Sequence, residues 1–316
     1  MNTSLVCASH APLMYCFSKK PAEHETVDGA FRSCADAVRK FDPELVVIFG
    51  PDHYSSLFRQ MVPPYCVGAA ATATADIGGH PGPLNVPKDL AVNLVRSVWD
   101  EGVDVALSYD LRVDHGLSQT LHRITGSISS YPTIPVIFNI MTPPLPLFRR
   151  SRLLGEAVGR YAAKLRKRIL FVASGGLSHN PVPIFPAYGT GDESMTAHQE
   201  HGPVDTGGLS AWLDRMDHIH RFAAGLLGEG KITAKDCKFN RDIDLKVLDL
   251  LQSGRLSELD SWNNDELIEK AGIGAPEIHG WLAACAANAA AGGGKPVVDF
   301  YAPVLEYGVA VGVMHA

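Results

Sequence analysis

The sequence lacks the features that mark secreted, membrane-spanning and cysteine-rich zinc proteins. Its six cysteines are scattered without a Cys-x-x-Cys pair, so we expect neither a disulfide framework nor a cysteine zinc site. No apolar run reaches the roughly 18 residues that a spanning helix needs. The first residues also lack the basic and apolar segments of a secretory signal. These absences predict a cytoplasmic protein that does not bind a membrane.

An excess of basic charge is missing as well. The 316 residues include 28 Lys and Arg against 34 Asp and Glu, which gives a formal net charge of -6 at pH 7. Proteins that bind nucleic acid usually carry a concentrated basic surface, so we do not expect nucleic acid as a partner. Hydrophobic residues make up 46% of the chain, which is typical of a globular protein with a large core.

Short apolar runs rich in β-branched residues alternate with amphipathic helical patterns in the first part of the chain. The predicted buried strands are residues 5–9, 45–50, 103–108, 133–139 and 169–174. The predicted helices between them are residues 29–40, 90–99 and 153–165. This alternation predicts an α/β fold with a mostly parallel central sheet flanked by helices.

The later part of the chain is mainly helical. Between about residues 181 and 290, the apolar spacing predicts helices over residues 210–227, 245–251 and 276–290. Residues 297–314 alternate apolar residues with charges and glycines, which predicts one or two returning strands or a hairpin. We expect one α/β domain over residues 1–316 with a C-terminal helical layer.

Four histidines occupy matching positions in this pattern. His10, His53, His115 and His179 each follow the end of a predicted strand or strand-like run. In open α/β sheets, ligands bind outside the carboxyl ends of the strands, so we expect these side chains to meet in one crevice. Imidazole is the commonest metal ligand and titrates near neutral pH. The pattern therefore predicts a site that both binds a metal and transfers protons.

Five segments together make the sequence resemble a known family. They are Ser9-His10-Ala11-Pro12, Pro51-Asp52-His53-Tyr54, Val113-Asp114-His115-Gly116, Gly175-Gly176-Leu177-Ser178-His179 and Glu277-Ile278-His279-Gly280-Trp281. In this order, and over essentially the whole chain, they resemble the class III extradiol dioxygenases.

The resemblance implies an α/β sandwich with iron(II) at the mouth of the sheet and no organic cofactor. It assigns the iron ligands to His10, His53 and Glu277, the catalytic base to His179 and the catalytic acid to His115. A face of two histidines and one carboxylate leaves coordination positions open and is diagnostic of non-haem iron(II) oxygenases.

Spacing alone leaves the third ligand open. Glu266 and Glu269 precede Glu277 in the same helical region, and only the family pattern selects Glu277. The alternative for Glu277 is a solvated glutamate in the first turn after Pro276, where a helix N-terminus favours negative charge.

Other polar residues near these segments have weaker claims to a role. Asp114 is adjacent to His115, but neighbouring side chains on an extended chain point apart, so we do not expect it to orient that imidazole. His218 and His220 are two apart on a predicted helix and do not face one way. His80, in a glycine-rich loop, is either a substrate contact or has no function.

The implied reaction is extradiol cleavage of a catechol by O2 in aromatic catabolism. Similar family members use 3-(2,3-dihydroxyphenyl)propionate or 2,3-dihydroxycinnamate. The alternatives are another catechol or an aminophenol, a zinc-dependent hydrolase that uses the same residues, and a metal-binding protein without catalysis. A carboxylate side chain should attract Arg or Lys, but the sequence does not rank Arg149, Arg150 and Arg152. The apolar C-terminal helices also predict a homo-oligomer of unspecified number.

Overall fold

The computed structural model describes residues 2–17, 19–181, 184–203 and 207–316. The strands are β1 (Thr3–Ala8), β2 (Leu45–Asp52), β3 (Tyr65–Gly68), β4 (Ala71–Ala73), β5 (Gly82–Pro83), β6 (Ala106–Ser108), β7 (Leu111–Val113), β8 (Thr133–Asn139), β9 (Ile169–Ser174), β10 (Val297–Val304) and β11 (Val309–His315). The α-helices are α1 (His24–Phe41), α2 (Lys88–Asp100), α3 (His115–Thr125), α4 (Phe148–Leu165), α5 (Glu193–His201), α6 (Gly208–Gly228), α7 (Arg241–Ser253), α8 (Asn264–Ala271) and α9 (Ile278–Ala290).

An eight-stranded sheet in the order β10-β11-β1-β9-β2-β8-β3-β6 forms the centre of the molecule. The four middle strands β1, β9, β2 and β8 run parallel to one another. The C-terminal hairpin β10–β11 adds to β1 in antiparallel orientation. A separate small sheet in the order β5-β4-β7 lies after β3 in the chain. The parallel strands bring their carboxyl ends to one edge.

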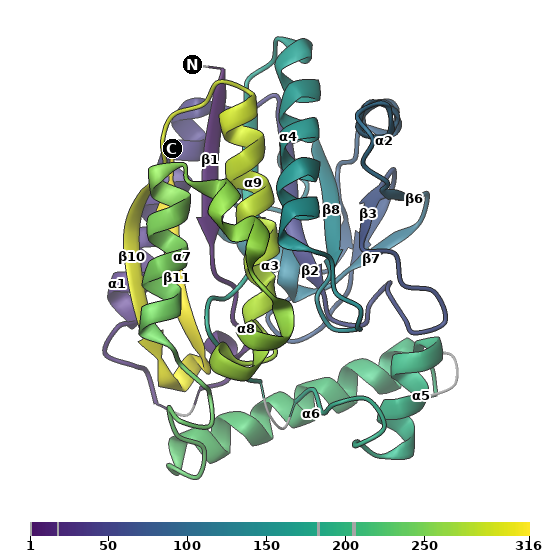
Figure 1. Ribbon diagram of the computed structural model, residues 1–316. Coiled ribbons are helices and arrows are strands. Elements are labelled where there is room, and N and C mark those ends of the chain that lie inside the picture. Colours follow the sequence, from purple (N-terminus) through teal and green to yellow (C-terminus); the bar gives the residue numbers. More distant parts are fainter. Residues whose placement is uncertain (1, 18, 182–183, 204–206) are drawn as a thin grey trace.

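Helices cover both faces of the large sheet (Figure 1). Side chains of a strand alternate between its two faces. Leu5 and Cys7 of β1 accordingly belong to the core beneath α4 and α9, and Val6 and Ala8 to the core beneath α1 and α3. The strands β2 and β9 are buried along their whole length. Their sequences are therefore mostly apolar without alternation, as is typical of parallel strands that are covered on both faces.

The helices α5 and α6 are arranged differently from the others. In Figure 1 they run across the lower end of the molecule, beneath the carboxyl ends of the parallel strands. The buried residues of α6 include Met216, His220, Ala223 and Leu227, which recur at three- and four-residue intervals and therefore share one face. This face closes the edge of the sheet at which a ligand would bind.

The predicted strands over residues 133–139 and 169–174 are confirmed as β8 and β9, and the C-terminal hairpin is confirmed as β10–β11. The strand predicted over residues 103–108 is shorter and comprises only β6. The short strands β3, β4, β5 and β7 were not predicted, because two to four residues carry too little periodicity. In the described part of the chain, no helix is long and apolar enough to cross a bilayer.

The helices α4 and α9 pack against each other, and glycine lets their two backbones come close. A Cβ atom added to Gly155 would lie 2.1 Å from the carbonyl oxygen of Ala283, and one added to Gly159 would lie 2.2 Å from that of Ala287. Neither backbone oxygen can move without displacing its helix. These two glycines therefore set how closely α9 approaches α4.

We predict that Gly155→Ala lowers the free energy of unfolding by about 1–3 kcal/mol or more, because the added methyl group overpacks a backbone contact. The matched control is Gly225→Ala on α6, where an added Cβ meets nothing within 4 Å. That change should stabilise the helix by up to about 1 kcal/mol, because alanine is the better helix former. Urea unfolding of both variants checks the prediction, and equal effects at the two positions would contradict it.

Candidate active site

The four histidines predicted from strand ends meet at the carboxyl edge of the sheet. His10 lies just beyond β1, His53 directly after β2 and His179 in the loop after β9. His115 follows β7 and Asp114 and is the first residue of α3. All four border one cavity, together with Glu277.

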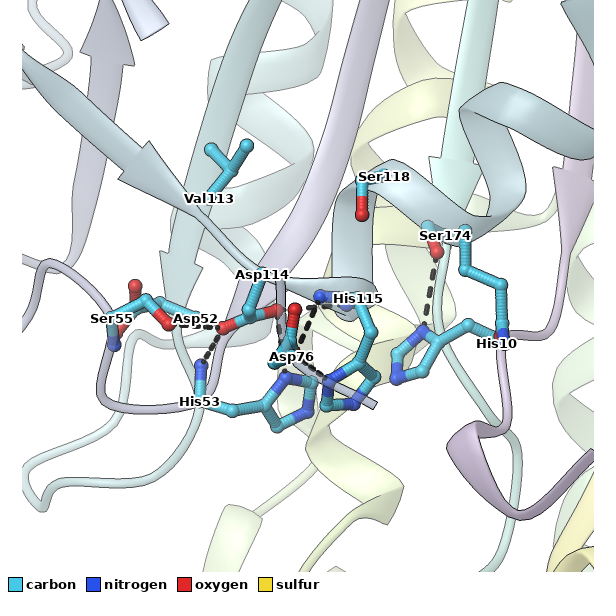
Figure 2. A network of polar contacts seen from close by, with 12 residues as sticks. His10, Asp52, His53, Ser55, Asp76, Val113, Asp114, His115, Ser118 and Ser174 are labelled. Carbon is cyan, nitrogen blue, oxygen red and sulfur yellow. Dashed lines mark hydrogen bonds and ion pairs between the residues drawn. The ribbon is translucent and has the colours of Figure 1, made fainter. Parts of the chain in front are cut away.

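Three of the imidazoles form a compact cluster. The ring of His53 stacks on that of His115 with centroids 4.6 Å apart, and His10 meets each of them edge-on at 5.3 Å. One ring nitrogen from each histidine lies within 4.8 Å of the others. Figure 2 shows the three rings side by side, each held by a polar partner on its outer side.

Glu277 brings a buried carboxylate to the same place. It ends a short 3₁₀ turn, Ala275–Glu277, from which α9 continues, and only 2% of its surface is exposed. Its Oε1 lies 3.2 Å from Nε2 of His53 and 3.5 Å from Nε2 of His179, and its Oε2 lies 3.7 Å from Nε2 of His10. The carboxylate also accepts a hydrogen bond from the backbone N–H of Gly176. Glu277 is therefore not the solvated first-turn glutamate that the alternative required.

Asp114 fixes the orientation of His53. Its side chain accepts hydrogen bonds from the backbone N–H of His53 at 2.8 Å and of Gly116 at 2.8 Å, and the second of these caps α3. Asp114 Oδ1 also lies 3.1 Å from Nδ1 of His53. Because an ionised carboxylate only accepts, Nδ1 carries a proton here, while Nε2 faces Oε1 of Glu277 on the other side of the ring.

Gly116 makes this arrangement of His53 possible. A Cβ atom at Gly116 would lie 2.7 Å from Cε1 of the His53 ring. Any larger residue would push the imidazole out of position.

Different partners hold His10 and His115. Nδ1 of His10 lies 3.2 Å from the hydroxyl of Ser174, the last residue of β9. Asp76, which follows β4, accepts from the backbone N–H of His115 at 3.0 Å and from its Nδ1 at 2.5 Å (Figure 2). Carboxylates and hydroxyls on the outer ring nitrogens are the usual supports of metal-binding and proton-transferring histidines.

His179 is held by backbone groups. Its Nδ1 donates to the carbonyl oxygen of Leu177 at 2.8 Å, which leaves Nε2 facing Glu277. The ring packs against Gly274, where an added Cβ would lie only 2.0 Å from Nε2. The segment before α9 therefore positions both His179 and Glu277.

The buried groups shift one another's pKa. Burial lowers the pKa of His10 to about 3. For His53, burial alone would lower the pKa, but Asp114 and Glu277 outweigh it and raise the pKa well above the ordinary value. Burial would raise the pKa of Glu277, but His10 and His179 hold it well below its usual range. The carboxylate is thus ionised in an apolar environment, which requires a positive charge nearby.

The donor set fits a divalent metal. The described residues that border the cavity include no Lys or Arg, so imidazoles are the only side chains among them that can carry a positive charge beside Glu277. A cation bound between these nitrogens and the carboxylate would compensate the negative charge. Two alternative sets of three metal ligands both include His10 and His53. The third ligand is Glu277 in one set and His115 in the other, since a ring nitrogen of His115 lies in the same cluster.

Most of the other residues that line the cavity are apolar. The residues that form its walls include Leu13, Met141, Ile184, Phe185, Ala223 and Leu227. The last two come from α6, so this helix closes the cavity opposite the polar groups. An aromatic ring bound here would be largely removed from water.

Other candidates lie outside this cavity. Glu266 and Glu269 are exposed on α8, and Glu266 pairs with Lys270, so neither reaches the histidines. His279 is buried but hydrogen-bonds Ser151 at 2.8 Å and Asn264 at 2.9 Å. Its role is to join α9 to α4 and α8.

His80 does not border the cavity either. Its ring stacks on that of His122 with centroids 3.5 Å apart. The sequence left its role open, and the geometry supplies no contact with the site.

Sequence reasoning missed two residues of the site. Asp76 supports His115 from 39 positions away, and nothing in the local sequence marks it. His220 borders the cavity from α6, whereas His218 is exposed. The two do face different ways, as expected, but the buried one belongs to the site.

Comparisons with known proteins agree with this geometry. Residues 4–310 match the family model described as the catalytic LigB subunit of aromatic ring-opening dioxygenase. A protein of Azotobacter vinelandii is 40% identical over 319 residues, covering 100% of this chain and 99% of its own length. One from a Rhodococcus species is 41% identical over 318 residues, covering 100% and 98%. One from Dechloromonas aromatica is 37% identical over 316 residues, covering 100% and 99%.

All three relatives are named 2,3-dihydroxyphenylpropionate/2,3-dihydroxicinnamic acid 1,2-dioxygenases. The family match spans nearly the whole chain, and it includes every residue that contributes to the cluster of imidazoles and the carboxylate. The chain therefore belongs to the family of LigB catalytic subunits of aromatic ring-opening dioxygenases.

Proposed function

We propose that this enzyme cleaves 3-(2,3-dihydroxyphenyl)propionate and 2,3-dihydroxycinnamate beside the diol, with O2, in aromatic catabolism. The observation that carries the proposal is the buried Glu277 carboxylate among the imidazoles of His10, His53 and His179, at the apolar cavity. The substrate follows from the names of relatives that align over the full chain. The proposal also places the enzyme in the cytoplasm as a homo-oligomer.

The family and the clustered imidazoles indicate a metal cofactor, which we propose is iron(II) held by His10, His53 and Glu277. When bound, iron(II) supplies adjacent positions for the diol and O2 and a path for electrons between them. Glu277 is preferred over His115 as the third ligand because its carboxylate would neutralise part of the metal's charge. It already faces the nitrogens of both other ligands.

The same geometry supports a division of proton transfer between His179 and His115. His179 directs Nε2 into the cavity because its Nδ1 donates to the Leu177 carbonyl, so in its neutral form it is placed to accept a hydroxyl proton of the catechol. The carboxylate of Asp76 accepts a hydrogen bond from Nδ1 of His115 and fixes its ring at the border of the cavity, where His115 is placed to act as the proton donor. The apolar walls keep competing water away from both.

The side-chain carboxylate of the substrate needs a cation, and the described residues that line the first cavity include no Lys or Arg. Arg152 forms ion pairs with Asp260 and Glu156. Its charge is therefore already neutralised, which excludes it as the partner of the substrate carboxylate. A second cavity shares Met141 and Phe185 with the first and is bordered by Arg59. The Arg59 guanidinium lies 3.7 Å from the ring centre of Tyr188. We assign the carboxylate to Arg59.

The first test is turnover of the iron(II)-loaded enzyme with 3-(2,3-dihydroxyphenyl)propionate. O2 and catechol should disappear one to one and yield a yellow ring-opened product, because the ring bond next to the diol breaks and both oxygen atoms enter the product. An oxygen electrode and mass spectrometry with labelled O2 measure this. The zinc-loaded enzyme is the control and should be inactive, since zinc does not change its oxidation state. Cleavage between the two hydroxyls, or hydrolysis without O2 uptake, would contradict the proposal.

The ligand assignment predicts which variants lose metal. His10→Ala and His53→Ala should purify without bound iron but folded, because each removes one of three ligands. Glu277→Gln should weaken iron binding strongly, whereas Glu266→Gln, an exposed matched control, should not. Elemental analysis and circular dichroism check this. Stoichiometric iron in any of the first three variants would remove that residue from the ligand set.

The proton-transfer assignment predicts the opposite behaviour at the other two histidines. His115→Ala and His179→Ala should keep their iron and lose about a hundred- to ten-thousand-fold in kcat, the typical contribution of a positioned acid or base. His218→Ala, on the exposed face of α6, should behave as wild type. Steady-state kinetics and metal content are the measurements.

Substitution by tyrosine distinguishes the residue that acts as acid from the one that acts as base. His115→Tyr should recover part of the rate, because a phenol can donate a proton, whereas His179→Tyr should recover none. Loss of iron in His115→Ala would instead identify the cluster of three histidines as the metal site. Equal recovery by tyrosine at both positions would overturn the division of roles.

A further inference from the structure

One polar side chain on the wall of the cavity has no role in the proposed reaction. The buried residues of α6 are Trp212, Met216, His220, Ala223, Ala224 and Leu227. His220 is the only polar residue among them, and it is 2% exposed. Its ring lies 6.2 Å from that of His115 and 6.5 Å from that of Phe185, measured between centroids. It borders the cavity that contains the metal-binding groups.

The hydrogen bonds of His220 determine which of its nitrogens carries the proton. Nδ1 lies 2.7 Å from the backbone carbonyl oxygen of Met216, which can only accept, so Nδ1 is the donor. Nε2 is buried and has no hydrogen-bond partner among the described residues. Leaving such a group unsatisfied costs about 1–3 kcal/mol. The helix therefore carries a destabilising acceptor at the wall of the cavity.

The charge state of His220 limits what its Nε2 can bind. Burial, followed by repulsion from His115, lowers the pKa of His220 to about 3. The other ionisable groups that influence it are His53, from the end of β2, and Asp217 on α6 itself. At neutral pH the ring is uncharged, and Nε2 offers a lone pair. A carboxylate, which also only accepts, is a poor partner for it, whereas a hydroxyl group is a good one.

We propose that Nε2 of His220 accepts a hydrogen bond from a hydroxyl group of the bound catechol, which makes His220 a further substrate-binding residue. The inference rests on the proposed function, since that function supplies a ligand with two hydroxyls and one carboxylate. The carboxylate is assigned to Arg59, and the diol lies near the metal-binding groups, beside which His220 projects from α6. The hydrogen bond would orient the aromatic ring between His115 and His179.

Binding of inert analogues to the iron(II)-loaded full chain tests this separately from turnover. The probes are 3-phenylpropionate, 3-(2-hydroxyphenyl)propionate and 3-(3-hydroxyphenyl)propionate, with dissociation constants from titration calorimetry. His220→Leu should weaken at least one hydroxylated probe about three- to tenfold, the usual range for one hydrogen bond. It should leave 3-phenylpropionate unchanged. His220→Gln should restore most of the loss, because its amide oxygen can accept.

Two variants serve as comparisons. His218→Leu changes an exposed histidine on the same helix and should bind every probe as wild type does. Arg59→Gln should weaken all three probes equally, because all carry the carboxylate. His220→Leu should also unfold at the same or a higher temperature than wild type, because leucine removes an unsatisfied buried acceptor. If His220 had a purely structural role, His220→Leu would unfold at a lower temperature than wild type.

The proposal is overturned if His220→Leu weakens the binding of 3-phenylpropionate as much as that of the hydroxylated probes. His220 would then contact the ring or the propionate group that all three probes share, and not a hydroxyl. The proposal is also overturned if the variant loses iron, or if no hydroxylated probe binds wild type more tightly than 3-phenylpropionate does. Absence of O2 uptake with the catechol would refute the proposed function alone, because the probes report on His220 without turnover.

Discussion

A buried carboxylate surrounded by imidazoles is the constraint on which the rest of the site depends. Glu277 is ionised in a cavity without Lys or Arg among its described lining residues, and an uncompensated charge there would cost several kcal/mol. The fold therefore holds His10, His53 and His179 against it. Outer partners fix the rings, and glycine at positions 116 and 274 leaves room for them. A bound metal cation would complete this balance of charge.

The site separates tasks between the sheet and the helices that cover it. The carboxyl edge of the sheet and the start of α9 supply the groups to which we assign metal binding and proton transfer. The helix α6 and the segment containing Phe185 supply apolar walls, which exclude water and so strengthen every electrostatic interaction inside. On the wall formed by α6, Nε2 of His220 is buried without a hydrogen-bond partner among the described residues, which is costly for folding. Proteins commonly accept such costs where a ligand is bound.

Much of the fold was predictable because buried parallel strands leave a clear local pattern. β8 and β9 were predicted with their observed bounds, since each is apolar throughout and ends at a polar residue. The helix α3 was missed. Its apolar residues Leu117, Leu121 and Ile124 do recur at helical spacing, but three such residues in one short polar segment are a weak signal, and its start depends on capping by Asp114. The small sheet β5-β4-β7 was missed because it depends on pairing between segments that are separated in the chain.

The sequence by itself determined that four histidines would gather at one edge, because the carboxyl ends of parallel strands share an edge and the histidines follow strand-like segments. It did not determine the carboxylate. Glu277, Glu266 and Glu269 are equivalent by spacing, and only packing buries the first and exposes the others. Tertiary structure also paired His115 with Asp76 and turned His220 inward. These contacts join residues distant in the chain, whose meeting depends on how whole elements pack and not on any local pattern.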